Sequence, residues 1–220
     1  STPIKSSAAS DVYKRQDEGI AFYDRFIDDL IARGIEPMIC LYHFDMPLAL
    51  AQEYNGFNDR RVMDAFIRYG KKMIDCFGDR VKYWLTFNEQ NIFHMPEAFR
   101  ISGYMKGDQT LRELYELQHH TMVAHMALTE YLHQTKPGQL MGGMLAHQLI
   151  YPATCKPRDI FCAQQYDEFL NQNLLRVFDG QGYSPAVMAV VEQEGFGDIY
   201  RAEDLALLAR TRNDYMAFSY

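Results

Sequence analysis

Apolar and polar positions along this chain fall into blocks that favour helix and strand in turn. In residues 17–34 the apolar side chains recur every three or four positions, which predicts an amphipathic helix. Residues 36–42 carry an unbroken apolar run, as expected for a strand that is covered on both faces. A second helical stripe runs from Val62 to Phe77, with Asn58 as its predicted N-cap.

The same alternation continues along the rest of the chain. It predicts a strand at 81–87, a helix at about 109–134, a strand at about 140–146, a helix at about 159–177, a pair of short helices at 185–209 and a strand at 215–219. Strands that alternate with helices at this spacing pair in parallel through right-handed crossovers. The predicted fold class is therefore α/β, with about four central strands and their helices.

The loop lengths differ between the two ends of the predicted strands. Connections from helix to strand are short, whereas those from strand to helix fill residues 43–58, 89–108 and 147–158. In barrels of parallel strands the long loops lie at the carboxyl ends of the strands, where substrate binds. We therefore expect an active site at that edge of the sheet.

The number of predicted strands indicates how much of a domain the chain contains. About four strands are predicted, whereas a closed barrel of this type has eight. We therefore expect residues 17–220 to be a fragment of a single (β/α)8 domain. Residues 1–16 are polar and rich in small residues, without an apolar period, and we expect an N-terminal tail or an artefact of how the sequence was obtained.

Composition narrows the classes of function. The 220 residues carry a formal net charge of -7, and the 22 Lys and Arg residues are scattered, so nucleic acid is not an expected partner. No apolar run reaches membrane-spanning length and no leader pattern is found, so we expect no membrane association and a cytoplasmic protein. The four cysteines are too far apart for Cys-x-x-Cys pairs and are expected to be reduced thiols.

The predicted strand at 81–87 ends abruptly in an amide and a carboxylic acid, Asn88 and Glu89. An acid at the carboxyl end of a barrel strand projects into the mouth of the active site, whereas the same acid in mid-strand would be buried without a partner. Glu89 is therefore the predicted catalytic acid. On spacing alone, a solvated acid at the end of a strand is an equally good interpretation.

The Thr-Phe-Asn-Glu motif at residues 86–89 resembles the acid/base strand of family 1 glycoside hydrolases, which cleave β-glycosides. Residues 42–47 (Tyr-His-Phe-Asp-Met-Pro) are similar to the family's third-strand motif, and residues 213–220 to its sixth strand. The similarity extends over about residues 18–220 and implies a partial (β/α)8 TIM barrel that holds strands 3 to 6 of the family pattern.

The resemblance implies roles for three residues. Glu89 would protonate the leaving oxygen, His43 would hydrogen-bond the sugar's hydroxyls, and Asn88 would hold its 2-hydroxyl. The implied ligand is a small-molecule β-glucoside. Neither a metal nor an organic cofactor is implied, and the oligomeric state is left open.

A retaining glycosidase also needs a second carboxylate as nucleophile. The family's nucleophile is a glutamate in a Glu-Asn-Gly segment, and no such segment occurs in these 220 residues. Glu97, Glu113 and Glu194 do not follow a predicted strand, so none of them is a candidate. We therefore expect this chain to lack the nucleophile and to be inactive alone.

Several positions depart from the more usual family pattern. Phe44, Met46 and Gln90 stand where tryptophan, leucine and proline are common, and together with residues 151–157 they resemble the 6-phospho-β-glucosidase branch. The expected substrate is then a 6-phospho-β-glucoside delivered by a sugar phosphotransferase system. A rival hypothesis is a non-catalytic carbohydrate-binding or self-assembling module that pairs across the open edges of the sheet.

For three further patterns, packing in the core is an alternative to a functional role. Glu116 and His119 form one Glu-x-x-His unit, but a di-iron site needs two such units and two more glutamates, so packing or solvent exposure is favoured. Gly142 and Gly143 lack the pattern of a phosphate-binding loop and are expected as small residues in a crowded strand. For Trp84 two interpretations stay open: it lines the sugar site or it packs in the core.

Overall fold

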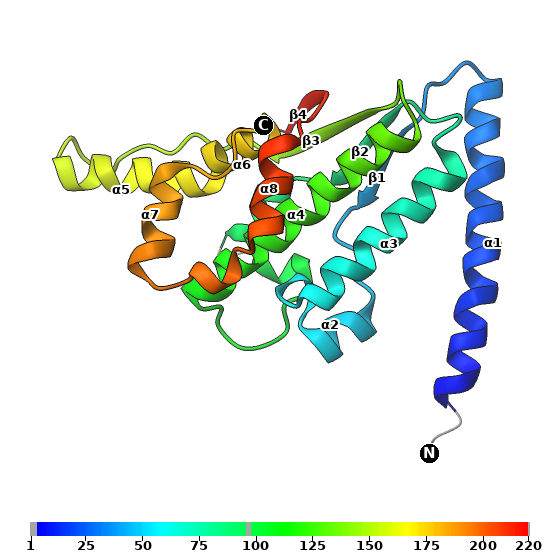
Figure 1. Cartoon of the computed structure of the whole chain (residues 1–220), viewed down its shortest axis with the longest axis horizontal. Helices are drawn as coiled ribbons and strands as arrows, with labels where there is room; N and C mark the ends of the chain where they lie inside the picture. Colours follow the sequence, from blue (N-terminus) through cyan, green and yellow to red (C-terminus); the bar gives the residue numbers. More distant parts are fainter. Residues whose placement is uncertain (1–3, 96–97, 220) are drawn as a thin grey trace.

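The computed structural model describes residues 4–95 and 98–219, with side chains from Asp17 onward. Its strands are β1 (Met38–Tyr42), β2 (Tyr83–Phe87), β3 (Leu140–Ala146) and β4 (Tyr215–Ser219). Its α-helices are α1 (Ile4–Ala32), α2 (Leu48–Tyr54), α3 (Arg60–Phe77), α4 (Leu111–Thr135), α5 (Pro157–Asp167), α6 (Asn173–Phe178), α7 (Pro185–Gln193) and α8 (Ala202–Arg210). Figure 1 shows these elements, and the predicted alternation of strands and helices is confirmed. Helix α2 is an addition, because residues 43–58 were predicted as a loop.

Two predicted helix starts differ from the structure. Helix α1 begins at Ile4 rather than at residue 17. Helix α3 is capped by Asp59 rather than by the predicted Asn58, because the Asp59 carboxylate accepts a hydrogen bond from the Arg61 N–H at 2.8 Å. The Asn58 side chain instead donates to the Glu113 carbonyl at 2.7 Å and so ties the start of α3 to α4.

The four strands form one parallel sheet in the order β1-β2-β3-β4. Met38 pairs with Tyr83, which pairs with Leu140, so the first three strands begin level with one another. Because all strands are parallel, their carboxyl ends meet at one edge of the sheet. In the described part of the chain β1 and β4 each pair with a single neighbour, so the sheet is open on both sides.

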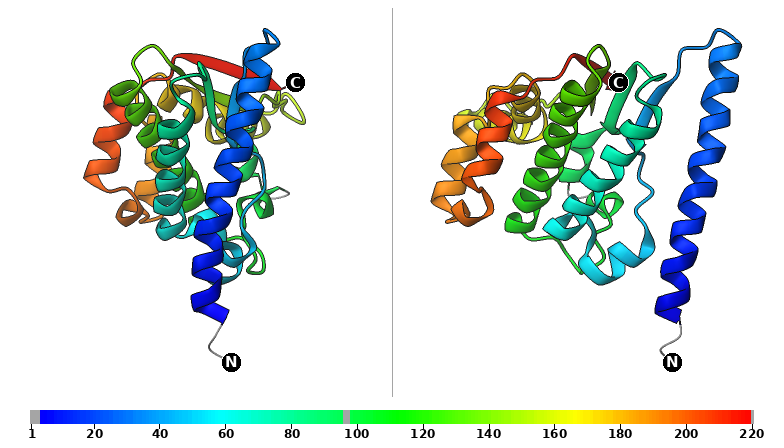
Figure 2. Two further views of the ribbon diagram at one scale, coloured as in Figure 1. Left: turned by 90° about the vertical axis from the view of Figure 1, so that its right-hand side faces the viewer. Right: turned by 45° about the vertical axis from the view of Figure 1, so that its right-hand side comes forward.

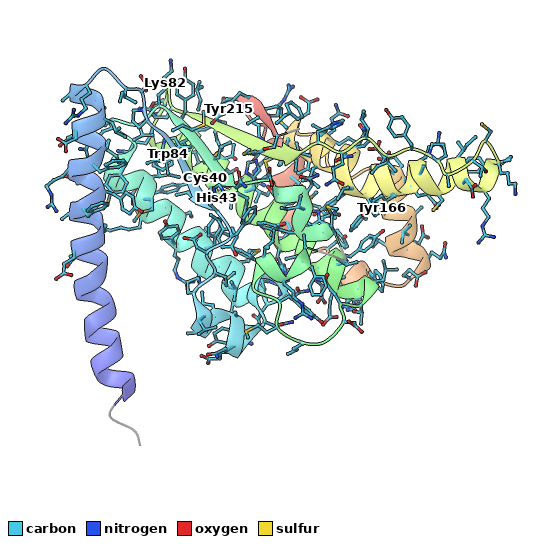
Figure 3. The ribbon with its side chains drawn as sticks, turned by 180° about the vertical axis from the view of Figure 1, so that it is seen from behind. Cys40, His43, Lys82, Trp84, Tyr166 and Tyr215 are labelled. Atoms are coloured by element: carbon cyan, nitrogen blue, oxygen red, sulfur yellow. The ribbon has the colours of Figure 1, made fainter. Side chains whose placement is uncertain are left out.

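The two faces of the sheet are covered unequally. Helices α3 and α4 lie over one face, and seen from behind the strands have no helix in front of them (Figures 1 and 3). Trp84 and its register partner Met141 are fully buried, whereas Met38 is 54% exposed and its partner Tyr83 is half-buried. The sheet is therefore an arc with one covered face, as expected for part of a barrel.

Trp84 and the glycine pair both pack within the sheet. The Trp84 side chain is fully buried and its indole N–H donates to the Val81 carbonyl at 2.9 Å, so it packs in the core rather than lining a site. A methyl group at Gly142 would overlap the ring of Tyr215. One at Gly143 would lie 2.5 Å from a ring carbon of Phe178 in α6. The crowding expected for these glycines is confirmed.

Helix α1 lies along one side of the molecule, beside α3 (Figure 2). Arg80, which precedes β2, holds it through hydrogen bonds of 2.5 Å to Asp24 and Asp28. Two of its rings remain outside this contact, since Phe22 is 56% and Tyr23 is 55% exposed. Asp24 and Asp28 thus attach α1 to the segment that leads into β2.

Three further findings bear on the expectations from composition. Cys40, Cys76, Cys155 and Cys162 are free thiols, and the last two are exposed. Across residues 4–95 and 98–219 no helix combines the length and the apolar character that a membrane crossing requires. Within the same ranges no group of three or more His, Cys, Asp or Glu side chains is arranged to hold a metal ion.

Gly70 of α3 marks a close approach between α3 and α4. A methyl group there would lie 2.5 Å from Cδ1 of Leu128, a fully buried side chain of α4. Gly70→Ala should therefore lower the free energy of unfolding by about 1–3 kcal/mol, although alanine usually stabilises a helix. Chemical denaturation followed by circular dichroism measures the change.

The matched control for this substitution is Gly19→Ala in α1, where a methyl group would meet nothing within 4 Å. There the free energy of unfolding should stay constant or rise by up to about 1 kcal/mol. Equal effects of the two substitutions would contradict the close packing of α3 on α4.

Candidate active site

The carboxyl ends of β1 and β2 are held side by side by the backbone. The Asn88 N–H donates to the Tyr42 carbonyl at 2.9 Å, so the parallel pairing continues one residue beyond β2. His43 follows Tyr42 directly, and Glu89 follows Asn88. The structure therefore places all three residues predicted from the sequence at the ends of two neighbouring strands, on the same edge of the sheet.

A cluster of aromatic rings supports these strand ends. The Tyr42 and Phe87 rings lie 5.8 Å apart, and both contact the Phe66 ring of α3. Phe57 and Phe93, on the loops that follow β1 and β2, complete the cluster and are fully buried. The polar ends of the strands thus rest on a rigid apolar base.

The side chains of the three predicted site residues have no hydrogen-bond partner among the described residues. Asn88 is 8% exposed, Glu89 is half-buried and His43 is exposed. None of these three side chains donates or accepts a hydrogen bond with any residue in the described ranges. Polar groups near the interior are normally paired. These groups are therefore available to a ligand.

The backbone at the two strand ends adopts a conformation that side chains disfavour. Glu89 has φ 44° and ψ 54°, and Phe44 has φ 71°. The left-handed region costs a residue with a Cβ about 1–2 kcal/mol. Such positions are concentrated at active sites, where the surroundings hold them.

Thr86 belongs to a buried chain of hydrogen bonds behind the acid. Its Oγ1 lies 2.5 Å from Nδ1 of His125 on α4, and the other ring nitrogen, Nε2, lies 2.7 Å from Oδ1 of Asn213. Burial lowers the pKa of His125 to about 4, so the ring is neutral. Because the Asn213 oxygen only accepts, Nε2 carries the hydrogen and the Thr86 hydroxyl donates to Nδ1. This chain connects β2 with the turn that precedes β4.

His119 serves packing rather than metal binding. It lies fully buried between the Tyr183 hydroxyl (2.8 Å) and the Asp204 carboxylate (3.1 Å), and Arg60 adds two hydrogen bonds of 2.7 Å to Asp204. Burial alone would raise the pKa of Asp204, but the bonds from His119 and Arg60 outweigh it and hold that pKa well below its usual range. Glu116, the other half of the Glu-x-x-His unit, pairs with Arg112 at 3.2 Å instead.

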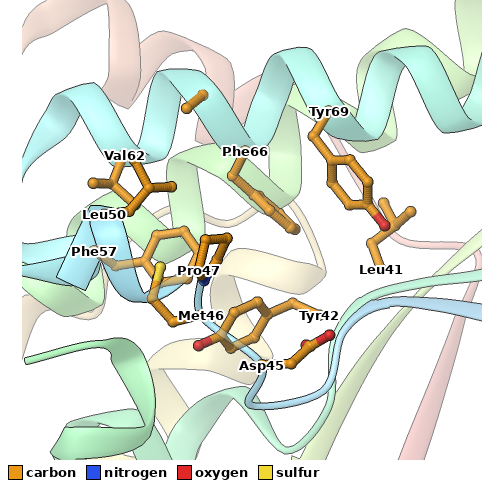
Figure 4. Close-up of a pocket in the computed structure, with 11 residues that line it drawn as sticks. Leu41, Tyr42, Asp45, Met46, Pro47, Leu50, Phe57, Val62, Phe66 and Tyr69 are labelled. Carbon is orange, nitrogen blue, oxygen red and sulfur yellow. The ribbon is translucent and has the colours of Figure 1, made fainter. Parts of the chain in front are cut away.

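Two hollows lie beside β1. A cavity of about 290 Å³ is lined by Tyr42, Asp45 and Phe66 among others (Figure 4). A groove of about 840 Å³ runs between α1, β1 and α3 and includes His43. Glu89 lines neither of them. His43 therefore faces the open side of β1, whereas Asn88 and Glu89 stand together at the end of β2.

The comparisons with known proteins agree with this geometry. The family model described as "Glycosyl hydrolase family 1" matches residues 11–220. The chain belongs to this family. Within family 1, it is 33% identical over 92% of its length to aryl-phospho-beta-D-glucosidase BglC of Bacillus subtilis, of which it covers 42%. It is 34% identical to 6-phospho-beta-glucosidase AscB of Escherichia coli, over 92% of this chain and 43% of that protein. The family 1 chain thus spans less than half the length of these relatives.

Solved structures of the family show the same fold. The beta-glucosidase from Thermotoga maritima superposes with a TM-score of 0.75 and 25% identity, over 92% of this chain and 45% of that one. The psychrophilic beta-glucosidase BglU from Micrococcus antarcticus gives a TM-score of 0.78 and 28% identity, over 91% of this chain and 42% of that one. The predicted partial TIM barrel is confirmed, and the resemblance to the phospho-β-glucosidase branch of family 1 is confirmed as well.

Sequence reasoning missed the residues that hold the site from behind. Asn91 and His125 are buried polar residues close to the acid, but their partners lie far along the chain. The sequence does not single out Asn91, because its neighbour Gln90 is also polar and buried. The partner of Asn91 is a backbone group, which no sequence pattern indicates.

The buried His125 predicts a pH dependence of stability. Its pKa is about 4 in the folded protein and about 6.5 in the unfolded chain, so between these values only the unfolded chain binds the proton. The stability that it contributes is complete above about pH 6.5 and is lost as the pH falls toward 4. In that window His125→Gln should reduce the slope of the unfolding free energy against pH by about 1.4 kcal/mol per pH unit. Denaturation at several pH values measures the slope, and an unchanged slope would contradict a buried neutral imidazole.

Proposed function

We propose that these residues belong to a retaining β-glycosidase that hydrolyses 6-phospho-β-glucosides, with Glu89 as its acid/base. One observation carries the proposal. At the end of β2 the Asn88 amide and the Glu89 carboxylate have no hydrogen-bond partner in the ranges 4–95 and 98–219, and the chain belongs to family 1. A carboxylic acid at the carboxyl end of a barrel strand, beside a hydrogen-bonding amide, suits the protonation of a glycosidic oxygen.

In the proposed mechanism Glu89 gives its proton to the glycosidic oxygen as the bond to the anomeric carbon breaks. A second carboxylate, about 5–5.5 Å from the first, attacks that carbon and forms a glycosyl-enzyme. Glu89 is then ionised and takes a proton from water, which releases the sugar with its configuration retained. Asn88 contributes a hydrogen bond to the 2-hydroxyl that strengthens as positive charge develops in the ring.

None of the three glutamates considered from the sequence supplies the second carboxylate in this proposal. Glu113 caps α4 and accepts from the Thr110 N–H at 2.9 Å, and Glu194 lies at the carboxyl end of α7. Glu97 lies outside the described residues. We therefore assign the nucleophile to residues of the whole protein that are not among these 220, and we expect the printed chain alone to be inactive.

The phosphate on the proposed substrate rests on the similar curated proteins. Several are named for phospho-glucosides, including BglC and AscB. A sugar phosphotransferase system delivers such compounds to the cytoplasm, which is the proposed site of action. The second candidate function, a self-assembling or carbohydrate-binding module, is favoured by the unpaired edges of β1 and β4 and by the exposed Phe22 and Tyr23 rings.

Glu89→Gln in the complete protein tests the acid/base role. With an aryl 6-phospho-β-glucoside that has a poor leaving group, kcat/KM should fall by about 10²–10⁴-fold, because departure needs the proton. With an activated dinitrophenyl group the loss in the first step should be much smaller. Steady-state and burst kinetics on the two substrates measure the difference.

The matched control is Glu192→Gln on α7, which makes the same charge change at an exposed position and should keep wild-type rates. Equal rates of wild type and Glu89→Gln on the poor leaving group would refute the assignment. If the complete wild-type protein cleaves neither the phosphorylated nor the free aryl β-glucoside, the module hypothesis is favoured.

A further inference from the structure

We propose that Asn91 is a positioning residue for Glu89, a role that rests on the proposed acid/base function. Asn91 comes two residues after the acid and is fully buried. Its side-chain amide makes two hydrogen bonds to the backbone of one residue on the next strand. Nδ2 donates to the Ala146 carbonyl at 2.8 Å, and Oδ1 accepts from the Ala146 N–H at 2.9 Å.

These two bonds join β2 to β3 beyond the point where the backbone pairing of the two strands ends. The described backbone pairing of β2 with β3 ends at Leu85 and Gly142, well before Ala146, the last residue of β3. The Asn91 amide offers Ala146 one acceptor and one donor, as a neighbouring peptide group would. Through this amide the segment after Glu89 is attached to β3.

The other side of Glu89 is attached to β1. The Asn88 N–H donates to the Tyr42 carbonyl at 2.9 Å, and the Ile92 N–H donates to the Glu89 carbonyl at 3.0 Å to close the turn. Glu89 therefore lies between two attachments, one residue before it and one two residues after it. Together they hold the loop on both neighbouring strands.

The attachments matter because the backbone of Glu89 is strained. Its φ of 44° lies in the left-handed region, which costs about 1–2 kcal/mol for a residue with a Cβ. Such a conformation persists only where the surroundings enforce it. If the bonds to Ala146 are lost, the loop is free to relax to an ordinary backbone, and the carboxylate moves with it.

Asn91 is itself held by a second buried amide. Asn171 lies in the π-helical segment Glu168–Gln172, between α5 and α6, and its Oδ1 accepts from Nδ2 of Asn91 at 3.2 Å. Its own Nδ2 donates to the Gln148 carbonyl, in the loop after β3, at 3.0 Å. Single π-helical turns are frequent at functional sites. The two amides thus connect the loop of the acid with the loop after β3.

The experiment uses the complete protein and a series of aryl 6-phospho-β-glucosides that differ in leaving group. Asn91→Ala should lower kcat/KM for a poor leaving group by about 100-fold, the cost of a displacement of about 1 Å. For an activated leaving group the loss should stay below about tenfold, because that substrate needs little protonation. KM should change little, since Asn91 contacts no ligand in this proposal.

Asn173→Ala is the matched control. Asn173 is also fully buried, and its amide also bonds backbone and side chain, since it accepts from the Ser184 N–H at 2.8 Å and donates to Gln118 at 3.0 Å. This variant should reduce kcat/KM by the same factor for all substrates of the series. Asn91→Ser replaces Asn91→Ala if that variant fails to fold, because it keeps one polar group at the buried site without adding a charge, and it should show the same direction of dependence on the leaving group.

The outcomes separate the two proposals. A steeper dependence on the leaving group in the Asn91 variants than in Asn173→Ala supports the positioning role. If Glu89→Gln shows a steep dependence and the Asn91 variants match Asn173→Ala, Asn91 only stabilises the fold and the inference is overturned, while the acid/base assignment stands. If Glu89→Gln shows no such dependence, the acid/base assignment fails and the positioning role falls with it.

Discussion

The hydrogen bond from the Asn88 N–H to the Tyr42 carbonyl, 2.9 Å long, determines the geometry of the candidate site. It extends the parallel pairing of β1 and β2 past the end of β2, so that His43 and Asn88 directly follow two paired strand ends and Glu89 comes next. The rings of Tyr42 and Phe87, the last residues of β1 and β2, lie 5.8 Å apart and pack beside this hydrogen bond. The positions of the candidate site residues thus follow from strand pairing and core packing.

Hydrogen bonding then distinguishes polar residues that support the fold from polar residues that are available to a ligand. Around the acid, Thr86, Asn91 and His125 are fully buried or nearly so, and each has hydrogen-bond partners. Burial without a partner is costly, so these contacts are conditions of folding. Asn88 and Glu89, at the same strand end, are without such partners in the described residues. The side chains that remain available to a ligand are therefore those that the fold does not use.

The sequence predicted the framework well and the contacts across it poorly. Hydrophobic periodicity identified the strands and helices, and the Thr-Phe-Asn-Glu motif identified the strand end that carries Glu89, because both signals are local. The link from Asn91 to Ala146 joins groups 55 residues apart and ends on a backbone atom, so no local pattern contains it. Asn58 and Asp59 are equally good caps by type, and only the backbone geometry selects Asp59.

The product formed by a Glu89→Ala variant of the complete protein provides the sharpest evidence on the acid/base assignment. With an activated aryl 6-phospho-β-glucoside this variant should form its glycosyl-enzyme and then accumulate it, because no base activates water. We predict that added azide, which needs no base, accelerates turnover and yields the β-glycosyl azide with retained configuration. Turnover that azide leaves unchanged, or an α-glycosyl azide as product, would contradict the assignment of Glu89 as the acid/base.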